Sequence, residues 1–184
     1  LTGGVEGTTT ATHWQNALNW LKQIRANTVL VMTGDPAVHA MVKSHCQYMG
    51  GVGRSERDFI AGALNTAMDG LPTKTELKAQ AVDLNTRHAR IVGQSIERYN
   101  SAGVRTVFDS TYYAAILAGM QAGSSVGTSL THKYMNILGI NQDASWNPTD
   151  DSEEMIQGGV VVGENIDGVG RRVVRNVTTH LTSN

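Results

Sequence analysis

A helix built largely from small residues lies at the centre of the sequence and constrains the fold more than any other stretch. Residues 104–108 precede it with a run of β-branched and aromatic side chains, which predicts a buried strand. Asp109 and Ser110 form a suitable N-terminal cap, and Gly123 is a natural helix end. Small side chains leave one face of this helix nearly flat, so we expect another stretch of backbone to approach it closely. The small residues on that face are Ala114, Ala115, Ala118, Gly119 and Ala122.

Helix and strand patterns alternate through the residues before this helix. Apolar residues recur at helical spacing after Thr10 and Thr12, which predicts a helix as far as about residue 25. The continuous apolar run 28–33 predicts a strand that is buried on both faces of a sheet. Such alternation predicts an α/β sandwich, in which a parallel or mixed sheet carries helices on both faces. The further elements expected here are helices over 36–50 and 73–85 and strands over 59–64 and 87–94.

The pattern changes after Ser110. Residues 133–140 return to apolar spacing and predict a second helix, and Ser152 is expected to cap a short third one. Two strands joined by a Gly-Asp-Gly turn should then form a hairpin, over residues 160–164 and 171–179. We therefore expect two units, an α/β domain over 1–109 and a smaller α+β domain over 110–184.

The composition excludes several classes of protein. The chain has 184 residues, enough for a sizeable core, and a net charge of −1, which offers no footprint for nucleic acid or an anionic membrane. No apolar run approaches the length of a membrane helix, so no membrane insertion is expected. The single Cys46 excludes an internal disulfide framework and fits a reducing compartment. Because the first residue is Leu1, we expect the chain to be a fragment or a processed product.

One short motif suggests an enzyme. Gly123, Ser125 and Gly127 match the G-x-S-x-G nucleophile elbow of serine hydrolases, and Asp167 and His180 follow in the order of a catalytic triad. That elbow requires a strand before the serine, whereas a helix is expected here. A serine hydrolase therefore stands as the alternative function.

Cofactor sites are poorly supported by the sequence. A nucleotide-binding α/β domain is a second rival, but the Gly-rich residues 50–53 follow a helix and lack a G-K-S/T motif. His39 and His45 lie six residues apart, a spacing that does not place two ligands on one face of a helix. We expect neither a cofactor nor a metal.

Several short motifs, spread over most of the chain, resemble contractile tail sheath proteins of myovirus-type phages and related injection machines. The small-residue helix is followed by T-H-K at 131–133 and L-G-I at 138–140, as at the start of that family's C-terminal domain. The V-x-R-x-V-T-T pattern within 173–179 is the most specific piece. The remaining matches are G-G-V-V-V at 158–162, L-T-G-G-V-E-G at 1–7 and L-N-T-R at 84–87, although residues 89–99 lack the family's usual Pro-Trp pair.

This resemblance implies a fold and a function. The fold would be a subtilisin-like, three-layer scaffold without catalysis, followed by a C-terminal domain that stops before the family's terminal arm. The function would be that of a structural subunit, not an enzyme. Its partners would be neighbouring sheath subunits in six-fold helical order, an inner tail tube protein and a baseplate. The subunit would be assembled in the host cytoplasm and reside in the virion, and this stretch alone would be a monomer or associate weakly.

Charged residues near the C-terminus are candidates for contacts between subunits. Arg171 and Arg175 would share one face of a strand, with Arg172 opposite, and an acidic stretch on another subunit could meet them. Lys133 lies in the family-like turn and could bridge to a neighbour. The alternative is that these are unrelated solvated patches. The acidic candidates are Asp150, Asp151, Glu153 and Glu154.

Overall fold

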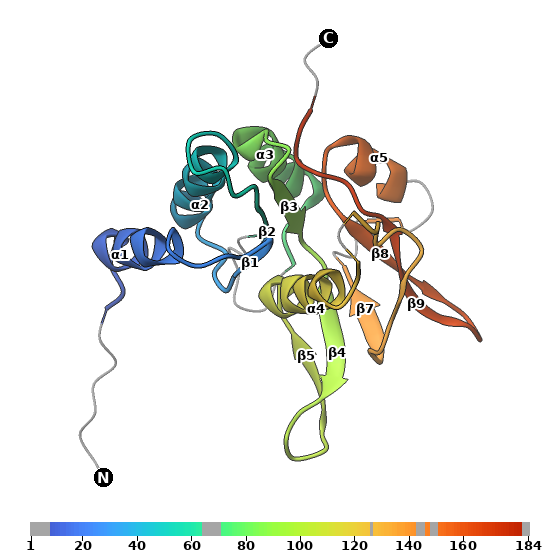
Figure 1. The fold of residues 1–184 in the computed structure, drawn as a ribbon. Coiled ribbons are helices and arrows are strands. Elements are labelled where there is room, and N and C mark those ends of the chain that lie inside the picture. The colour runs from blue at the N-terminus through green and yellow to red at the C-terminus, as the bar shows by residue number, and fades with distance from the viewer. Residues whose placement is uncertain (1–7, 64–70, 126, 143–145, 148–150, 182–184) are drawn as a thin grey trace.

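Three short parallel strands form the centre of the molecule, with helices on both sides (Figure 1). The structure is a computed structural model that describes residues 8–63, 71–125, 127–142, 146–147 and 151–181. Its helices are α1 (Ala11–Leu21), α2 (Pro36–Gly50), α3 (Lys74–Leu84), α4 (Ser110–Ala122) and α5 (Asp151–Gln157). Its strands are β1 (Thr28–Val31), β2 (Asp58–Gly62), β3 (Ala89–Val92), β4 (Ser95–Tyr99), β5 (Arg105–Phe108), β6 (Tyr134–Met135), β7 (Gly139–Asn141), β8 (Val162–Ile166) and β9 (Gly170–Arg175).

The parallel sheet has the order β1-β2-β3, and alternate residues of its central strand face opposite sides. Phe59 and Ala61 pack in a core with residues of α2 and α3, whereas Ile60 packs in a second core with residues of α4. All three side chains are fully buried, because β2 is covered on both faces. The predicted mixed α/β class is therefore confirmed.

The face of α4 that lies against this sheet coincides only in part with the predicted flat face, because larger side chains such as Tyr113 share it. Ala114 and Ala118 are buried, whereas Ala115 is half-buried and Gly119 and Ala122 are exposed. Ala114 and Leu117 are fully buried in the core on that side. The start of α4 passes so close to β2 that a Cβ at Gly62 would lie 2.7 Å from Oγ of Ser110. Gly62 is thus required by the close approach of the two backbones.

Polar side chains cap the starts of α2 and α3. Asp35 accepts a hydrogen bond from the backbone N–H of Ala37 at 2.9 Å, directly before Pro36 at the first turn of α2. Thr73 and Glu76 form a capping box at the start of α3. The helix boundaries predicted for α2, α3 and α4 are confirmed to within two residues.

The strands before α4 differ from the prediction. β5 was expected to be buried, but its side chains alternate between exposed and half-buried, because it is the outer strand of an antiparallel pair with β4. The strand β4 was not predicted. The expectation that 28–33 is buried on both faces is also wrong, because β1 is an edge strand in which only Val31 is fully buried.

Residues 133–140 do not form the expected helix. β6 pairs with β9 and β7 pairs with β4, so this stretch joins two separate sheets. His132, just before it, has a positive φ of 59°, which a continuing right-handed helix would not allow. Pairing with distant strands therefore outweighs the local apolar spacing.

The C-terminal hairpin is confirmed, with one irregularity. β8 and β9 pair antiparallel, and the register shifts opposite Val162 and Gly163, so the alternation along β9 is broken before Arg175. Arg171 and Arg175 therefore do not share a face in the simple way predicted. Ser152 lies inside α5, which begins at Asp151 rather than after a Ser152 cap.

The residues after α4 pack against those before it. Val161 donates its backbone N–H to Ile91, and Thr179 donates to Ala89, so both segments continue the β3 edge of the parallel sheet. The division into units 1–109 and 110–184 stays a prediction. In the part of the chain that the structure describes, every helix is too short or too polar to cross a membrane.

Candidate functional site

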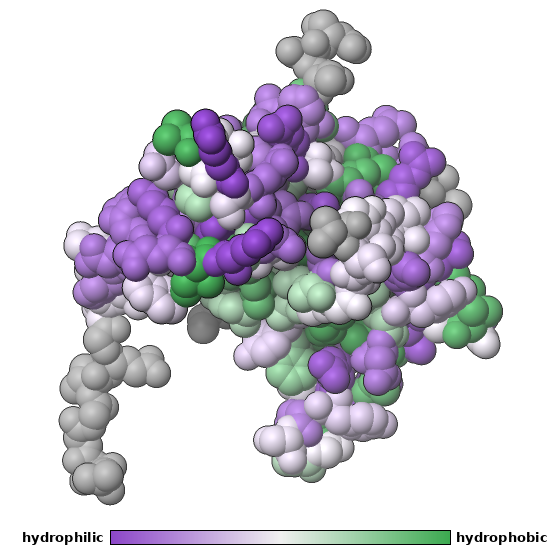
Figure 2. Space-filling model, viewed as in Figure 1, coloured by the Kyte–Doolittle hydropathy of each residue, from purple (hydrophilic) through white to green (hydrophobic). Residues whose placement is uncertain are grey.

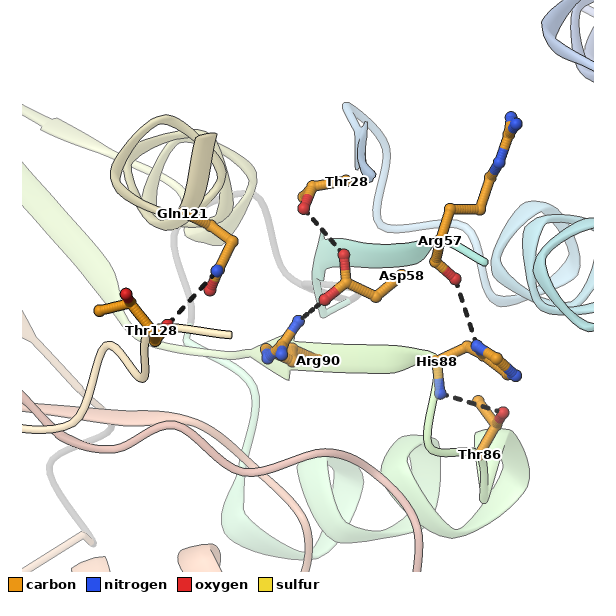
Figure 3. A network of polar contacts seen from close by, with 8 residues as sticks. All are labelled: Thr28, Arg57, Asp58, Thr86, His88, Arg90, Gln121 and Thr128. Atoms are coloured by element: carbon orange, nitrogen blue, oxygen red, sulfur yellow. Dashed lines mark hydrogen bonds and ion pairs between the residues drawn. The ribbon is translucent and has the colours of Figure 1, made fainter. Parts of the chain in front are cut away.

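A polar groove of about 780 Å³ lies at the amino ends of β1, β2 and β3 and beside the end of α4 (Figure 3). Within it, Thr28 donates from Oγ1 to Oδ1 of Asp58 at 2.8 Å, and Arg90 forms an ion pair with the other oxygen of Asp58. On the far wall, the side-chain amide of Gln121 donates to the backbone carbonyl of Thr128 at 3.4 Å. These contacts tie neighbouring strands together and occupy the carboxylate of Asp58.

A second part of the network surrounds Arg57, which is only 2% exposed. Its guanidinium donates to the carbonyls of Leu21 at 3.1 Å and Ile24 at 3.0 Å, at the C-terminal end of α1. It also lies 3.3 Å from Nε2 of His45. A cation at a helix C-terminus is favourable, so Arg57 anchors α1 to the core.

This groove lacks the parts of a catalytic centre. The ring of His88 contacts the carbonyl of Arg57 at 3.2 Å, and its backbone N–H donates to Thr86 at 3.3 Å, so both contacts are structural (Figure 3). Across the described ranges, no group of three or more His, Cys, Asp or Glu side chains could hold a metal ion.

The residues of the hydrolase alternative are not brought together. Ser125 comes shortly after the end of α4 at Ala122, so a helix and not the strand that a nucleophile elbow requires precedes it. Asp167 lies in the turn between β8 and β9, and His180 is an exposed residue after β9. Among the described residues no hydrogen bond joins any two of these three side chains.

The acidic contact candidates that the structure describes are anchored within the chain. Asp151 lies 2.8 Å from Nζ of Lys74, and Glu154 forms an ion pair with Lys78. The hydrogen bond from Lys74 lowers the pKa of Asp151. Glu153 accepts from Gln157 at 3.3 Å and is exposed, whereas Asp150 lies outside the described residues.

Lys74 and Lys78 are partners that the sequence reading missed. They lie four residues apart on a predicted helix, and Asp151 and Glu154 lie three apart on another. Each spacing places two charges on one face of its helix, so the sequence alone would have allowed a pairing of α3 with α5 to be predicted. The acidic stretch therefore fixes α5 on α3.

The basic candidates lie in different surroundings. Arg172 donates from Nε to Glu164 at 2.5 Å across the β8–β9 hairpin, and this bond raises the pKa of Arg172. Arg171 is half-buried near Glu97. Lys133 and Arg175 are exposed. The structure thus leaves Lys133, Glu153 and Arg175 as the candidates that are open to a neighbour.

Solved structures of sheath proteins have folds similar to this one. The sheath tail protein of Desulfitobacterium hafniense superposes on 97% of the chain with a TM-score of 0.74 at 14% sequence identity, and the match covers 37% of that protein. The sheath tail protein of Listeria innocua superposes on 100% of the chain with a TM-score of 0.72 at 16% identity, again over 37% of its length. The helical sheath protein of the contracted anti-feeding prophage matches 98% of the chain and 46% of its own, with a TM-score of 0.59 at 10% identity.

The fold is therefore one that sheath tail proteins share. In sequence, the chain is 26% identical to the tail sheath protein of Bacillus phage SP01 over 185 residues. That match covers 100% of the chain and 31% of the length of the phage protein. No protein-family model matches the chain. The resemblance to tail sheath proteins that the short motifs indicate is confirmed.

Proposed function

We propose that the chain is part of a structural subunit of a contractile tail sheath. The observation that carries this proposal is the similarity to a phage tail sheath protein along the whole of the chain. The fold shared with sheath proteins supports it. The subunit resides in the virion and is assembled in the host cytoplasm.

The proposed mechanism is mechanical. Subunits form six-fold rings that stack in a helix around an inner tail tube, in an extended state that a baseplate triggers to contract. The free energy for contraction is held in the contacts between subunits, so no cofactor is needed. The parallel sheet with α2 and α3 on one face and α4 on the other is consistent with a rigid, subtilisin-like scaffold.

Neighbouring subunits are the first partners to consider. Lys133, Glu153 and Arg175 are exposed and remain proposed contact residues. Asp151, Glu154 and Arg172 already hold partners within the chain, so they would contact a neighbour only by sharing or exchanging those partners.

Sedimentation velocity tests this function. Protein produced from the complete reading frame should sediment as large ordered polymers, whereas particles that stay monomeric at high concentration would contradict a sheath role. The hydrolase alternative has its own test, which is labelling with a fluorophosphonate probe. We expect no labelling, and label on the unmodified protein that is lost in Ser125→Ala would establish the alternative instead.

A further inference from the structure

Two hairpins project from the body of the molecule at separate places (Figure 1). One is formed by β4 and β5 and the other by β8 and β9. Large apolar side chains are exposed on both: Tyr99 at 64%, Val104 at 58% and Val107 at 57% on the first, and Val169 at 63% on the second. Hydrophobic surface is visible where the β8–β9 hairpin ends (Figure 2). The three on the first hairpin form a candidate site of association, and Val169 is a single apolar side chain at the tip of the second.

The first hairpin carries an apolar groove on the side that faces α4. The groove has a volume of about 500 Å³, and its lining includes Ile96, Phe108, Tyr112 and Ile116. The ring centroids of Phe108 and Tyr112, two of these lining residues, lie 4.9 Å apart. One charged side chain, Arg98, also lines the groove, and within the described residues it has no ion-pair partner.

The second hairpin presents the complementary chemistry at its tip. Gly168, with a positive φ of 71°, turns the chain between Asp167 and Val169, both of which are exposed. Tyr134 lies against Gly170, 3.4 Å from the position of an added Cβ, and so supports the base of the turn. Asp167 has no ion-pair partner among the described residues. The tip therefore offers one apolar side chain and one carboxylate.

We propose that the β8–β9 tip of one copy docks in the β4–β5 groove of the next copy. Val169 enters the apolar groove, and Asp167 pairs with Arg98 at its edge. Because the two hairpins project at separate places, the β8–β9 tip of a copy does not lie in the β4–β5 groove of that same copy (Figure 1). The inference rests on the proposed function, and it names a pair of surfaces for that assembly.

The geometry of this contact suits a sheath. The two surfaces differ, so the contact is heterologous, and repeating it produces a ring or an open helix rather than a closed dimer. The apolar side chain supplies buried area, and the charge pair fixes the register of the two copies. Such a contact has one charge on each side, which makes it testable by reversing both.

Charge reversal in the protein from the complete reading frame tests the contact. Arg98→Glu and Asp167→Arg should each raise the protein concentration needed for polymers roughly tenfold, because like charges then face each other. The double variant should assemble close to the unmodified protein. Arg25→Glu and Asp83→Arg are matched controls, since both residues are exposed and lie outside the two hairpins, Arg25 between α1 and β1 and Asp83 on α3. Single variants that assemble normally, or a double variant that is worse than either, would overturn the inference.

A crosslink separates this inference from the proposed function. Protein carrying Arg98→Cys, mixed with protein carrying Asp167→Cys, should give a disulfide between the two chains under mild oxidation. Cys46 is fully buried and does not compete. The crosslink reports the contact in any associated state, whether or not tubes form, and each variant oxidised alone is the control. Failure to crosslink in an assembly of normal appearance would overturn the contact and leave the sheath role intact.

Discussion

The side-chain amide of Gln94 forms two hydrogen bonds with the backbone of Gly163, although the two residues are 69 positions apart. Its Nε2 donates to the carbonyl of Gly163 at 2.8 Å, and the N–H of Gly163 donates to Oε1 at 2.7 Å. Gln94 is completely buried. It follows β3 and takes the place of a neighbouring strand for β8, so it fastens the C-terminal hairpin to the rest of the fold.

Replacing the side-chain amide of Gln94 should lower the free energy of unfolding. Gln94→Leu leaves both backbone groups of Gly163 buried without partners, and each orphan costs about 1–3 kcal/mol, so we expect a loss of about 3 kcal/mol in the free energy of unfolding. Urea denaturation measures it. Gln23→Leu is the control, because Gln23 is exposed and should change stability by under about 0.5 kcal/mol. Equal effects of the two substitutions would contradict this role for Gln94.

Gly163 also makes room for Tyr113. A Cβ at residue 163 would overlap the Tyr113 hydroxyl and lie 2.7 Å from Cδ1 of Ile140, so Gly163→Ala should destabilise by about 1–3 kcal/mol. Burial raises the pKa of Tyr113, and its hydroxyl has no hydrogen-bond partner within the described part of the chain.

Tyr113→Phe should therefore be neutral or stabilising by up to about 1 kcal/mol, because it removes an unpartnered buried polar group. It should also reduce the cost of Gly163→Ala, which a double-mutant cycle measures. Tyr112→Phe, at a position 47% exposed, is the control. A large loss of stability in Tyr113→Phe alone would show that the hydroxyl holds a partner.

Two buried histidines should make the fold sensitive to acid. Burial lowers the pKa of His39, which lies near Asp35, and of His45, which also faces the cations Arg57 and Lys22. The folded state then binds fewer protons than the unfolded chain. The free energy of unfolding therefore keeps its full value above pH 6.5, the ordinary pKa of histidine, and falls as the pH drops below it. The unfolding temperature should decline between pH 7.5 and pH 5.

Substitution identifies the histidines responsible. His39→Gln with His45→Gln should flatten this pH dependence, whereas His180→Gln, at an exposed position, should leave it unchanged. Thermal unfolding followed by circular dichroism at several pH values gives the comparison. An unfolding temperature that declines just as steeply without His39 and His45 would assign the acid sensitivity to other groups.

Cys46 should be inert in the folded protein. It is completely buried, and burial raises the pKa of its thiol to about 12. At pH 8 only roughly one thiol in 10,000 is then ionised, and the thiolate is the reactive form. We expect no reaction with an aromatic disulfide reagent over an hour, and full reaction in denaturant. Rapid reaction without denaturant would mean that α2 opens readily.

The elements that the sequence predicts correctly are those whose ends are fixed by local chemistry. Caps at Asp35, Thr73 and Asp109 begin α2, α3 and α4, and each contact lies within three residues. Residues 133–140 were assigned wrongly because β6 and β7 exist only through pairing with β9 and β4. The β4–β5 hairpin had a local signal that was overlooked, since Asn100 and Gly103 stand between two alternating segments.

The candidate site was predicted less well than the fold. Charge alone picked out Asp151, Glu154 and Arg172, but not their partners, which lie on the distant helix α3 for the two acidic residues and across the predicted hairpin for Arg172. Gln94 and Arg57 gave no signal at all, because an isolated polar residue looks the same in a sequence whether it is exposed or buried. Only the fold shows which charged side chains already form ion pairs within the chain.

Electron microscopy of the protein from the complete reading frame, at high concentration, tests the sheath role most directly. We predict hollow, striated tubes of uniform width, since the proposed contacts repeat along a helix. Dispersed globular particles under all salt conditions would contradict a sheath function.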